Sequence, residues 1–422
     1  VPWATDPTAQ VIHDCFTKDG RPHELAPRNV LRRVLALYEA IGLQPVIAPE
    51  LEFYLVQRNT DPDFPLLPPA GRNGRPETAR QSYSIDAVNE FDPILDLMYD
   101  YCEAMELDVD TLIHESGAAQ LEVNFEHADP MSRADQVFLF KRTMREAAMR
   151  HGIYATFLAK PMENEPGSSM HIHQSLVDAR SGKNVFAGPR KGVHSQLFMH
   201  YLGGLQKYVP AAMALFAPYV NSYRRLVRSN SAPINIQWGT DNRTVGIRSP
   251  VATATARRIE NRVIGADANP YVALAATLAC GYLGIKNRIA PGAECRGAAG
   301  GLDRHVGELP MATGLPAVAG MVAGGDADRL LERDTVAGGA DLELLFVFEL
   351  HIRLAEQRVA AAHNFRAGHL RQRSRAELEI LLPMRLQDVG DGEVVFPCQT
   401  QIVVDIAARV DHDGEPVPAP QD

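Results

Sequence analysis

Residues 170–176 alternate apolar and polar side chains, which is the two-residue period of a β-strand with one buried face. The polar side chains on one face are His171, His173 and Ser175. The apolar side chains on the other face are Met170, Ile172 and Leu176. The apolar face can pack against a core while two imidazoles and a hydroxyl point into a shared space. A strand of this kind suits a binding or catalytic site.

Three other stretches have the same alternation, and each carries charged or amide side chains on one face. These side chains are Glu50 and Glu52 in the first stretch, Gln120, Glu122 and Asn124 in the second, and Arg258, Glu260 and Arg262 in the third. Glu115 comes in the turn just before the second stretch. One such pair alone is more often a solvated strand face. Four strands together predict a sheet with one apolar face and one face around a charged cavity.

The remaining periodicity predicts a chain of mixed helices and strands, the α+β class. We expect helices over residues 26–42, 86–107, 132–151, 196–215 and 270–286. The strand with Glu50 and Glu52 is expected to span residues 45–56, and further strands are expected over residues 153–158, 234–238 and 244–248. Ser132 and Asp135 are interpreted as a capping box, and residues 57–82 and 221–233 as loops. Residues 340–363 could form one helix, and residues 384–422 are expected to be partly disordered.

Charge and cysteine usage exclude several classes of partner. The formal net charge of -10 argues against nucleic acid, because phosphate binding needs a basic surface. The 5 cysteines are scattered and form no CxxC pair, which fits a reducing compartment. The longest apolar run, residues 271–285, is too short to span a bilayer, and no signal peptide opens the sequence. We therefore expect a soluble, cytoplasmic protein that binds neither nucleic acid nor membrane.

The charged face predicts a site for hard divalent cations and phosphate. A ligand set dominated by carboxylates favours Mg²⁺ or Mn²⁺ over zinc. Its candidate ligands, enough for two sites of three ligands each, are Glu50, Glu52, Glu115, Glu122, Glu260 and His171. The arginines that can bind phosphate and carboxylate groups are Arg225, Arg243, Arg248, Arg258 and Arg262. This combination indicates phosphoryl transfer onto a carboxylate substrate, without a Walker motif or a GxGxxG turn.

In the segments that carry these residues, the sequence resembles the glutamine synthetase family. The resemblance rests on segments that occur in the order and spacing of the family, namely residues 50–52, 115–122, 160–162, 167–173, 221–226, 241–243, 258–262 and 269–271. It covers roughly residues 10–296, and as an ordered set it is specific. It implies an ATP-dependent ligase that phosphorylates the γ-carboxylate of glutamate, after which an amine displaces phosphate and leaves an amide.

The resemblance also implies a role for each site residue. One metal ion would be held by Glu52, Glu115 and Glu122, and the other by Glu50, His171 and Glu260. The nucleotide and phosphate contacts would be His173, Ser175, Arg243 and Arg258. The contacts to glutamate and the acyl phosphate would be Gly167, Arg225, Arg248 and Arg262. Among these residues, the catalytic ones would be Arg225, Arg243 and Arg262, which stabilise the charge on the phosphoryl group in transfer.

In the family that the sequence resembles, a flap follows the segment that corresponds to residues 221–226, and its sequence indicates which amine is used. Ammonia-using members of the family carry a glutamate two residues before a proline there, and this sequence has Ser231 before Pro233. Serine supplies no charge for ammonium but leaves room for a larger amine. Residues 231–239 resemble the γ-glutamylamide ligases, which join glutamate to a polyamine or alkylamine. Two alternatives stay open: an ammonia-using glutamine synthetase, and a non-catalytic structural member of the family.

The resemblance implies a domain organisation as well. Residues 1–24 are interpreted as the remnant of an N-terminal β-grasp domain that began earlier in the chain. Residues 25–296 would form the catalytic domain, a curved antiparallel sheet backed by helices, and residues 297–422 an atypical C-terminal region. The expected assembly is a homo-oligomeric ring similar to a dodecamer.

Overall fold

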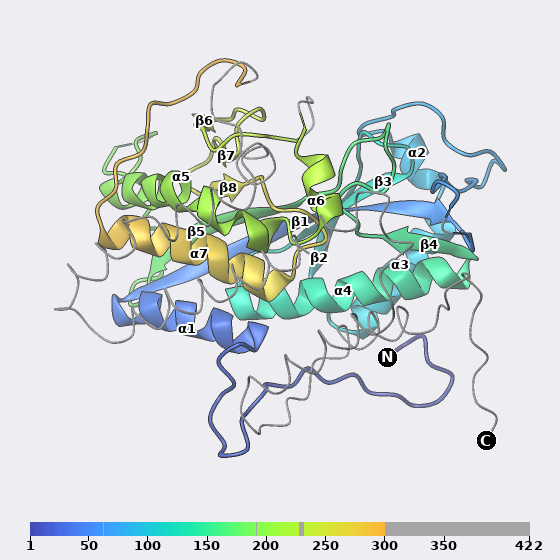
Figure 1. Ribbon diagram of the computed structural model, residues 1–422, viewed down its shortest axis with the longest axis horizontal. Coiled ribbons are helices and arrows are strands. Elements are labelled where there is room, and N and C mark those ends of the chain that lie inside the picture. Colours follow the sequence, from blue (N-terminus) through green and yellow to red (C-terminus); the bar gives the residue numbers. More distant parts are fainter. Residues whose placement is uncertain (62, 191, 228–231, 300–422) are drawn as a thin grey trace, which may run out of the picture. The chain divides into compact units, whose positions relative to one another are not determined.

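The computed structural model describes residues 1–299 except residues 62, 191 and 228–231 (Figure 1). The predictions for Ser231, for the helix over residues 340–363 and for the disorder of residues 384–422 therefore lie outside the described residues. Residues 1–15 and 23–299 belong to one compact unit, which contains every element below. Residues 16–22 belong to a second unit and contain one isolated bridge, between Phe16 and Pro22.

The described residues form one mixed sheet whose strand order is β2-β3-β1-β5-β8-β7-β6, with β4 also paired to β1. The strands are β1 (Leu43–Gln57), β2 (Val109–His114), β3 (Gln120–Phe125), β4 (Ile153–Thr156), β5 (Met170–Asp178), β6 (Trp238–Thr240), β7 (Ile247–Ser249) and β8 (Ile259–Asn261). Neighbouring strands are antiparallel except β6 and β7, which are parallel. The four strands predicted to carry charged faces are β3, β1, β5 and β8, and they lie side by side.

The register places the charged side chains of these four strands opposite one another. Glu50 pairs with His171 across β1 and β5, and Glu52 pairs with Glu122 across β1 and β3. His173 pairs with Glu260 across β5 and β8. Because directly paired residues point to the same face of a sheet, the carboxylates and imidazoles all share one face.

Helices cover the opposite, apolar face of the sheet. The helices are α1 (Pro27–Ala40), α2 (Ile85–Asn89), α3 (Asp92–Ala104), α4 (Pro130–Arg150), α5 (Gln196–Phe216), α6 (Val220–Arg225) and α7 (Pro270–Lys286). Figure 1 shows α1, α4, α5 and α7 lying across the strands. Phe140 of α4 packs edge to face on Phe53 of β1 and Phe125 of β3. The amide of Gln174 in β5 bonds to Tyr201 of α5 and Thr277 of α7.

Two of the predicted helices differ from the structure, one by a break and one at its N-terminal end. The helix expected over residues 86–107 is two helices, α2 and α3, because Pro93 cannot donate a hydrogen bond to the preceding turn and its ring clashes with that turn. The capping box at Ser132 and Asp135 is wrong. The N-cap of α4 is Asp129, whose carboxylate accepts from the backbone N–H groups of residues 131 and 132, and Pro130 follows it.

Other differences concern short elements. Strand β2, which ends at His114 just before Glu115, was not predicted. Helix α6 lies in a stretch expected to be a loop, where the Ser222 hydroxyl accepts from the Tyr219 N–H. Strands β6 and β7 begin later than the expected strands over residues 234–238 and 244–248. The other expected helices and strands are confirmed to within a few residues.

Within the described part of the chain, no helix is both long and apolar enough to cross a membrane.

Candidate active site

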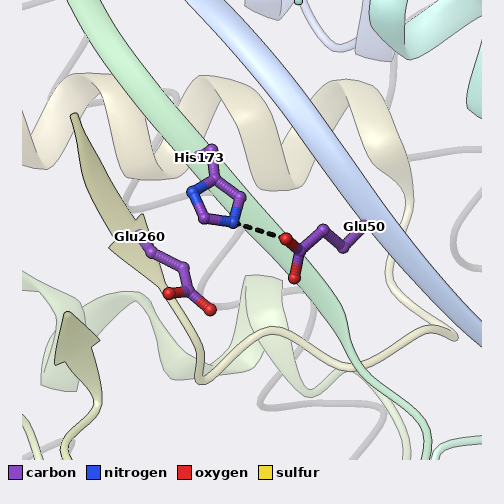
Figure 2. Close-up of side chains that lie close together, drawn as sticks. All are labelled: Glu50, His173 and Glu260. Atoms are coloured by element: carbon purple, nitrogen blue, oxygen red, sulfur yellow. Dashed lines mark hydrogen bonds and ion pairs between the residues drawn. The ribbon is translucent and has the colours of Figure 1, made fainter. Parts of the chain in front are cut away.

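Glu50 lies on the charged face between two imidazoles, and Figure 2 shows it facing one of them, that of His173. Its Oε1 lies 2.7 Å from His173 Nε2, and its Oε2 lies 3.3 Å from His171 Nδ1. The Glu260 carboxylate points toward the same space from β8, and its Oε1 is 3.9 Å from His171 Nδ1. Strands β1, β5 and β8 thus bring together side chains that are far apart in the sequence.

A second group of carboxylates adjoins the first. Glu52, Glu115 and Glu122 each place an oxygen within 4.8 Å of the others. Glu52 is buried, and its Oε2 accepts a 2.7 Å hydrogen bond from the Ser169 backbone N–H. Two further groups, in which potential ligand atoms lie equally close, are Glu50 with His173 and Glu260, and Glu50 with Glu122 and His171. The structure therefore brings together every predicted metal ligand, and it adds His173 to the set.

The electrostatics of the carboxylates show an excess of negative charge. Burial and the charge of Glu115 raise the pKa of Glu52 to about 7. Burial and the charges of Glu50 and Glu52 raise the pKa of Glu122 to about 10, and burial also raises the pKa of Glu115. Carboxylates that resist ionisation at neutral pH are stabilised in their charged form by a bound cation. This part of the site therefore favours cation binding.

The pKa values of Glu50, Glu260 and His171 are lowered instead of raised. Burial raises the pKa of Glu50, but hydrogen bonds from His171 and His173 outweigh it and hold that pKa well below its usual range. Burial also acts on Glu260, yet the nearby His173 and Arg262 lower its pKa to about 2. Burial and the charge of Arg262 lower the pKa of His171 to about 4, so this imidazole is neutral at pH 7.

The state of His171 tests whether the residues fit a metal ion. Its Nδ1 faces Glu50, so Nδ1 carries the proton and Nε2 carries a free lone pair. His171 Nε2 is buried and has no hydrogen-bond partner, and neither has Asn124 Oδ1, whose residue pairs with Glu50 in the sheet. Buried polar atoms without partners are costly unless a ligand or water satisfies them. A neutral imidazole beside several carboxylates fits Mg²⁺ or Mn²⁺.

Arginines surround the carboxylates on the β7–β8 side. Arg248 Nη1 donates to Glu260 Oε2 at 2.8 Å, and Arg262 donates to the other oxygen of the same carboxylate. The Nε atoms of both arginines are buried without a partner. Arg258 Nε donates to His173 Nδ1 at 3.0 Å. Free N–H groups beside the carboxylates are suited to anionic oxygens.

The remaining predicted site residues lie in different surroundings. Arg225 is buried, and its guanidinium bonds to Ser169 Oγ and to the carbonyl groups of residues 262 and 263. It therefore links the segment just before β5 to the residues just after β8. Arg243 bonds to the hydroxyl of Tyr83 at 3.3 Å. Ser175 lies on the same face of β5 as the two imidazoles, beyond His173, opposite Val46.

Sequence reasoning missed several residues that hold the site in place. The Tyr54 hydroxyl donates to the Pro166 carbonyl at 2.7 Å and contacts Gln120. Asp241 bonds to Arg248, and Glu165 Oε2 accepts from the Ala118 N–H at 3.1 Å. Tyr54 shares the parity of Glu50 and Glu52 in β1, so the two-residue period could have found it. Asp241 lies in the segment over residues 241–243 that carries the resemblance, but no role was predicted for it, and no local signal marks Glu165.

Gly167 meets the side chain of Arg225 so closely that no larger residue fits. A Cβ at this position would lie 2.5 Å from Arg225 Cγ and 2.6 Å from the Ala159 carbonyl oxygen. We expect Gly167→Ala to lower the free energy of unfolding by about 1–3 kcal/mol through overpacking, measured by urea denaturation. The control is Gly292→Ala, whose Cβ would be 3.7 Å from the nearest atom. Equal stability of the two variants would contradict this contact.

Comparison with known proteins agrees with this geometry. The model of the glutamine synthetase catalytic domain matches residues 24–317. The chain belongs to the glutamine synthetase family. The family and the α+β fold expected from the sequence are therefore confirmed. The fold is a catalytic-domain sheet backed by helices.

Several relatives within the family are described by name. The chain is 39% identical to the gamma-glutamylputrescine synthetase PuuA of Escherichia coli, over 68% of this chain and 61% of the relative. It is 38% identical to a glutamine synthetase of Pyrococcus horikoshii, over 69% and 62%. It is 35% identical to the glutamate–isopropylamine ligase of a Pseudomonas species, over 69% and 63%. The chain thus spans about three fifths of the length of these relatives.

A solved structure shares the fold. The complex of GmaS with ADP superposes with a TM-score of 0.65 at 27% sequence identity, over 86% of this chain and 79% of that chain. The structure of GmaS without ligand gives the same TM-score. The division of the present chain at residues 24/25 and 296/297 stays a prediction.

Proposed function

We propose that this protein is an ATP-dependent ligase that joins the γ-carboxylate of glutamate to an amine through a γ-glutamyl phosphate. The observation that carries the proposal is the convergence of carboxylates and a neutral His171 with an unpartnered Nε2, beside arginines with free N–H groups. Such an arrangement suits the transfer of a phosphoryl group to a carboxylate. Relatives named as glutamate–amine ligases support the same reaction.

The metal ligands are proposed from the geometry above. Glu52, Glu115 and Glu122 would hold one divalent cation, as their mutual proximity allows. The second would be held by Glu50, His171 and Glu260. In the structure Glu50 shares one close group with His173 and Glu260 and another with Glu122 and His171. Bound Mg²⁺ or Mn²⁺ would neutralise the phosphate oxygens of ATP and polarise the phosphoryl group.

The arginines of the site and His173 would bind the substrates. Arg248 and Arg262 hold Glu260 and keep their Nε–H groups free, so they can donate to the glutamate carboxylate and the acyl phosphate. Arg225 and Gly167 would fix the backbone of β8 and of the segment before β5, and so the position of Arg262. Arg243, Arg258, His173 and Ser175 would contact the nucleotide, with Arg258 orienting the imidazole of His173.

The amine is proposed to be a polyamine or a small alkylamine. Ser231 in place of a glutamate and the names of two relatives, which include putrescine and isopropylamine, support this choice. An ammonia-using glutamine synthetase is the second candidate, because the Pyrococcus relative is nearly as similar. A purely structural role is disfavoured by the intact set of carboxylates. We also keep the predictions of a cytoplasmic protein and of a homo-oligomeric ring.

An amine panel tests the proposed reaction. The purified protein with ATP, Mg²⁺ and glutamate should release phosphate with putrescine, spermidine, methylamine or isopropylamine at a kcat/KM at least about tenfold above that with ammonium, a difference of about 1.4 kcal/mol. Omission of glutamate should abolish the release. Equal or better turnover with millimolar ammonium would favour the second candidate, and no glutamate-dependent release with any amine would contradict the enzymatic proposal.

A further inference from the structure

The end of the long loop before α2 lies against the hairpin that carries Glu115. We call this segment, residues 77–83, the strap, and the hairpin consists of β2, β3 and the turn between them. The Tyr83 N–H donates to the His114 carbonyl at 2.8 Å, and the hydroxyls of Ser82 and Ser116 lie 2.9 Å apart. Glu77 makes two further contacts, to the His114 ring and to the Ala119 N–H. The loop was expected to be a surface segment, so a buried acidic side chain in it requires an explanation.

The Glu77 carboxylate contacts the buried ring of His114. Glu77 Oε2 lies 2.9 Å from His114 Nε2, and the two side chains are 7% and 0% exposed. His114 Nδ1 lies 2.8 Å from the backbone carbonyl of Glu115. The ring of His114 thus joins the Glu77 carboxylate to the backbone of Glu115. Through this contact Glu77 fixes the His114 ring against the residue that carries the proposed ligand.

Glu77 also fixes the turn that follows Glu115. Three consecutive N–H groups of this turn donate to three different side chains: residue 117 to Gln120 Oε1, residue 118 to Glu165 Oε2 and residue 119 to Glu77 Oε2. The last bond, at 2.7 Å, holds Ala119, whose φ of 57° lies in the left-handed region. A non-glycine residue keeps this conformation only when its surroundings impose it.

Glu115 needs such support because it shares a small space with two other carboxylates. It lies in reach of Glu52 and Glu122, and its side chain is only half-buried. Without a cation, an ionised carboxylate is more stable in water than in such a place, so a mobile side chain would turn toward solvent. A rigid hairpin keeps the three carboxylates together before a cation binds, which is the preorganisation that a metal site requires.

We propose that Glu77 is a positioning residue that, through His114 and Ala119, keeps the Glu115 carboxylate in place for a divalent cation. This inference rests on the proposed cation site and names a residue outside it. The strap would thus affect the affinity of the site for a divalent cation although it supplies no metal ligand. Removal of the Glu77 charge should therefore weaken cation binding without removing a ligand.

The test is the titration of the purified protein with Mn²⁺ alone, followed by the electron paramagnetic resonance of free Mn²⁺. Glu77→Gln keeps the size of the side chain, but its amide oxygen is a weaker acceptor than a carboxylate for the Ala119 N–H and the His114 ring. We expect its Kd for Mn²⁺ at one site to rise about tenfold or more, as for other residues that orient metal ligands. The matched control is Glu90→Gln, because Glu90 Oε2 accepts from the Asn73 N–H and anchors the same loop away from the hairpin. This control should bind Mn²⁺ like the unaltered protein.

A second comparison separates positioning from general destabilisation. In a Glu115→Gln background, where the ligand is already lost, Glu77→Gln should cause no further loss of Mn²⁺ affinity. An equal further loss in that background would overturn the positioning role. Should Glu77→Gln fail to fold, Glu77→Asp keeps the charge and withdraws the carboxylate by one methylene, and a severalfold weaker affinity is expected. Mn²⁺ affinity unchanged in the folded variant would also overturn the inference, whereas an unaltered protein that binds no Mn²⁺ would contradict the proposed cation site itself.

Discussion

Replacement of Glu260 by alanine should lower glutamate- and amine-dependent phosphate release by about a thousandfold or more, the scale expected when a metal site loses a ligand. Glu260 is fully buried and bonds to Arg248 and Arg262. Its removal takes a carboxylate from the group with Glu50 and His173, leaves Arg262 without its carboxylate partner and leaves Arg248 with Asp241 alone. The measurement is the initial rate of phosphate release at saturating ATP, glutamate and amine.

Two controls make this result specific. Loss of a buried ion-pair partner costs about 3–5 kcal/mol of stability, so folding is checked by circular dichroism, and Glu260→Gln is measured as a variant of nearly unchanged volume. Both variants should be inactive, because an amide is a poor ligand for Mg²⁺ and does not neutralise the arginines. Glu39→Ala, at an exposed position near the end of α1, should be fully active. More than a tenth of the normal rate in folded Glu260→Ala would show that this carboxylate holds no essential cation.

Removal of divalent cations should abolish turnover and reveal a pH-dependent loss of stability. The folded-state pKa values of Glu52 and Glu122, about 7 and about 10, lie above the ordinary value of 4.5. At these two groups the folded protein therefore binds more protons than the unfolded chain above pH 4.5, and their contribution to the free energy of unfolding falls as the pH rises toward 8. For Glu52 alone the fall is about 3 kcal/mol at its limit. The lowered pKa of Glu260, about 2, leaves its contribution constant over this range.

Mn²⁺ should cancel this loss, because a cation takes the place of the protons. At a Mn²⁺ concentration of 100 Kd, each site adds about 2.7 kcal/mol to the free energy of unfolding. The measurement is the Tm at pH 5, 6, 7 and 8 in EDTA and in Mn²⁺, and the difference between the two series should widen with pH. Glu122→Gln is the matched control, since it lacks the group with the most strongly raised pKa and should show a smaller slope in EDTA. A gap between the series that does not change with pH would contradict the account of these carboxylates.

The sheet and most of its charged face could be predicted from the sequence because period and chemistry agree in each strand. Glu50 and Glu52, or His171 and His173, are two residues apart while apolar residues fill the other face. Parity alone then places these groups on one surface. It cannot give the register, so the pairing of His173 with Glu260 and its contact with Glu50 came only from the structure.

Other features depend on contacts that no local pattern carries. Strands β6, β7 and β8 are three residues long, and their pairing is decided by neighbours distant in the sequence. The Glu77–His114 pair joins residues 37 apart, and one partner comes from a stretch rich in turn-forming residues. Arg225 was expected to face substrate, but its guanidinium is occupied by Ser169 and by two carbonyl groups. A single sequence shows that an arginine is present but not which acceptors surround it.

The most direct test of the central claim is a crystal structure of the protein grown with Mn²⁺ and ADP, with data collected at the manganese absorption edge. The account predicts anomalous peaks between β3, β1, β5 and β8, within coordination distance of Glu52, Glu115 and Glu122 and of Glu50, His171 and Glu260. Well-ordered crystals without anomalous density there, with His171 Nε2 still unpartnered, would contradict it.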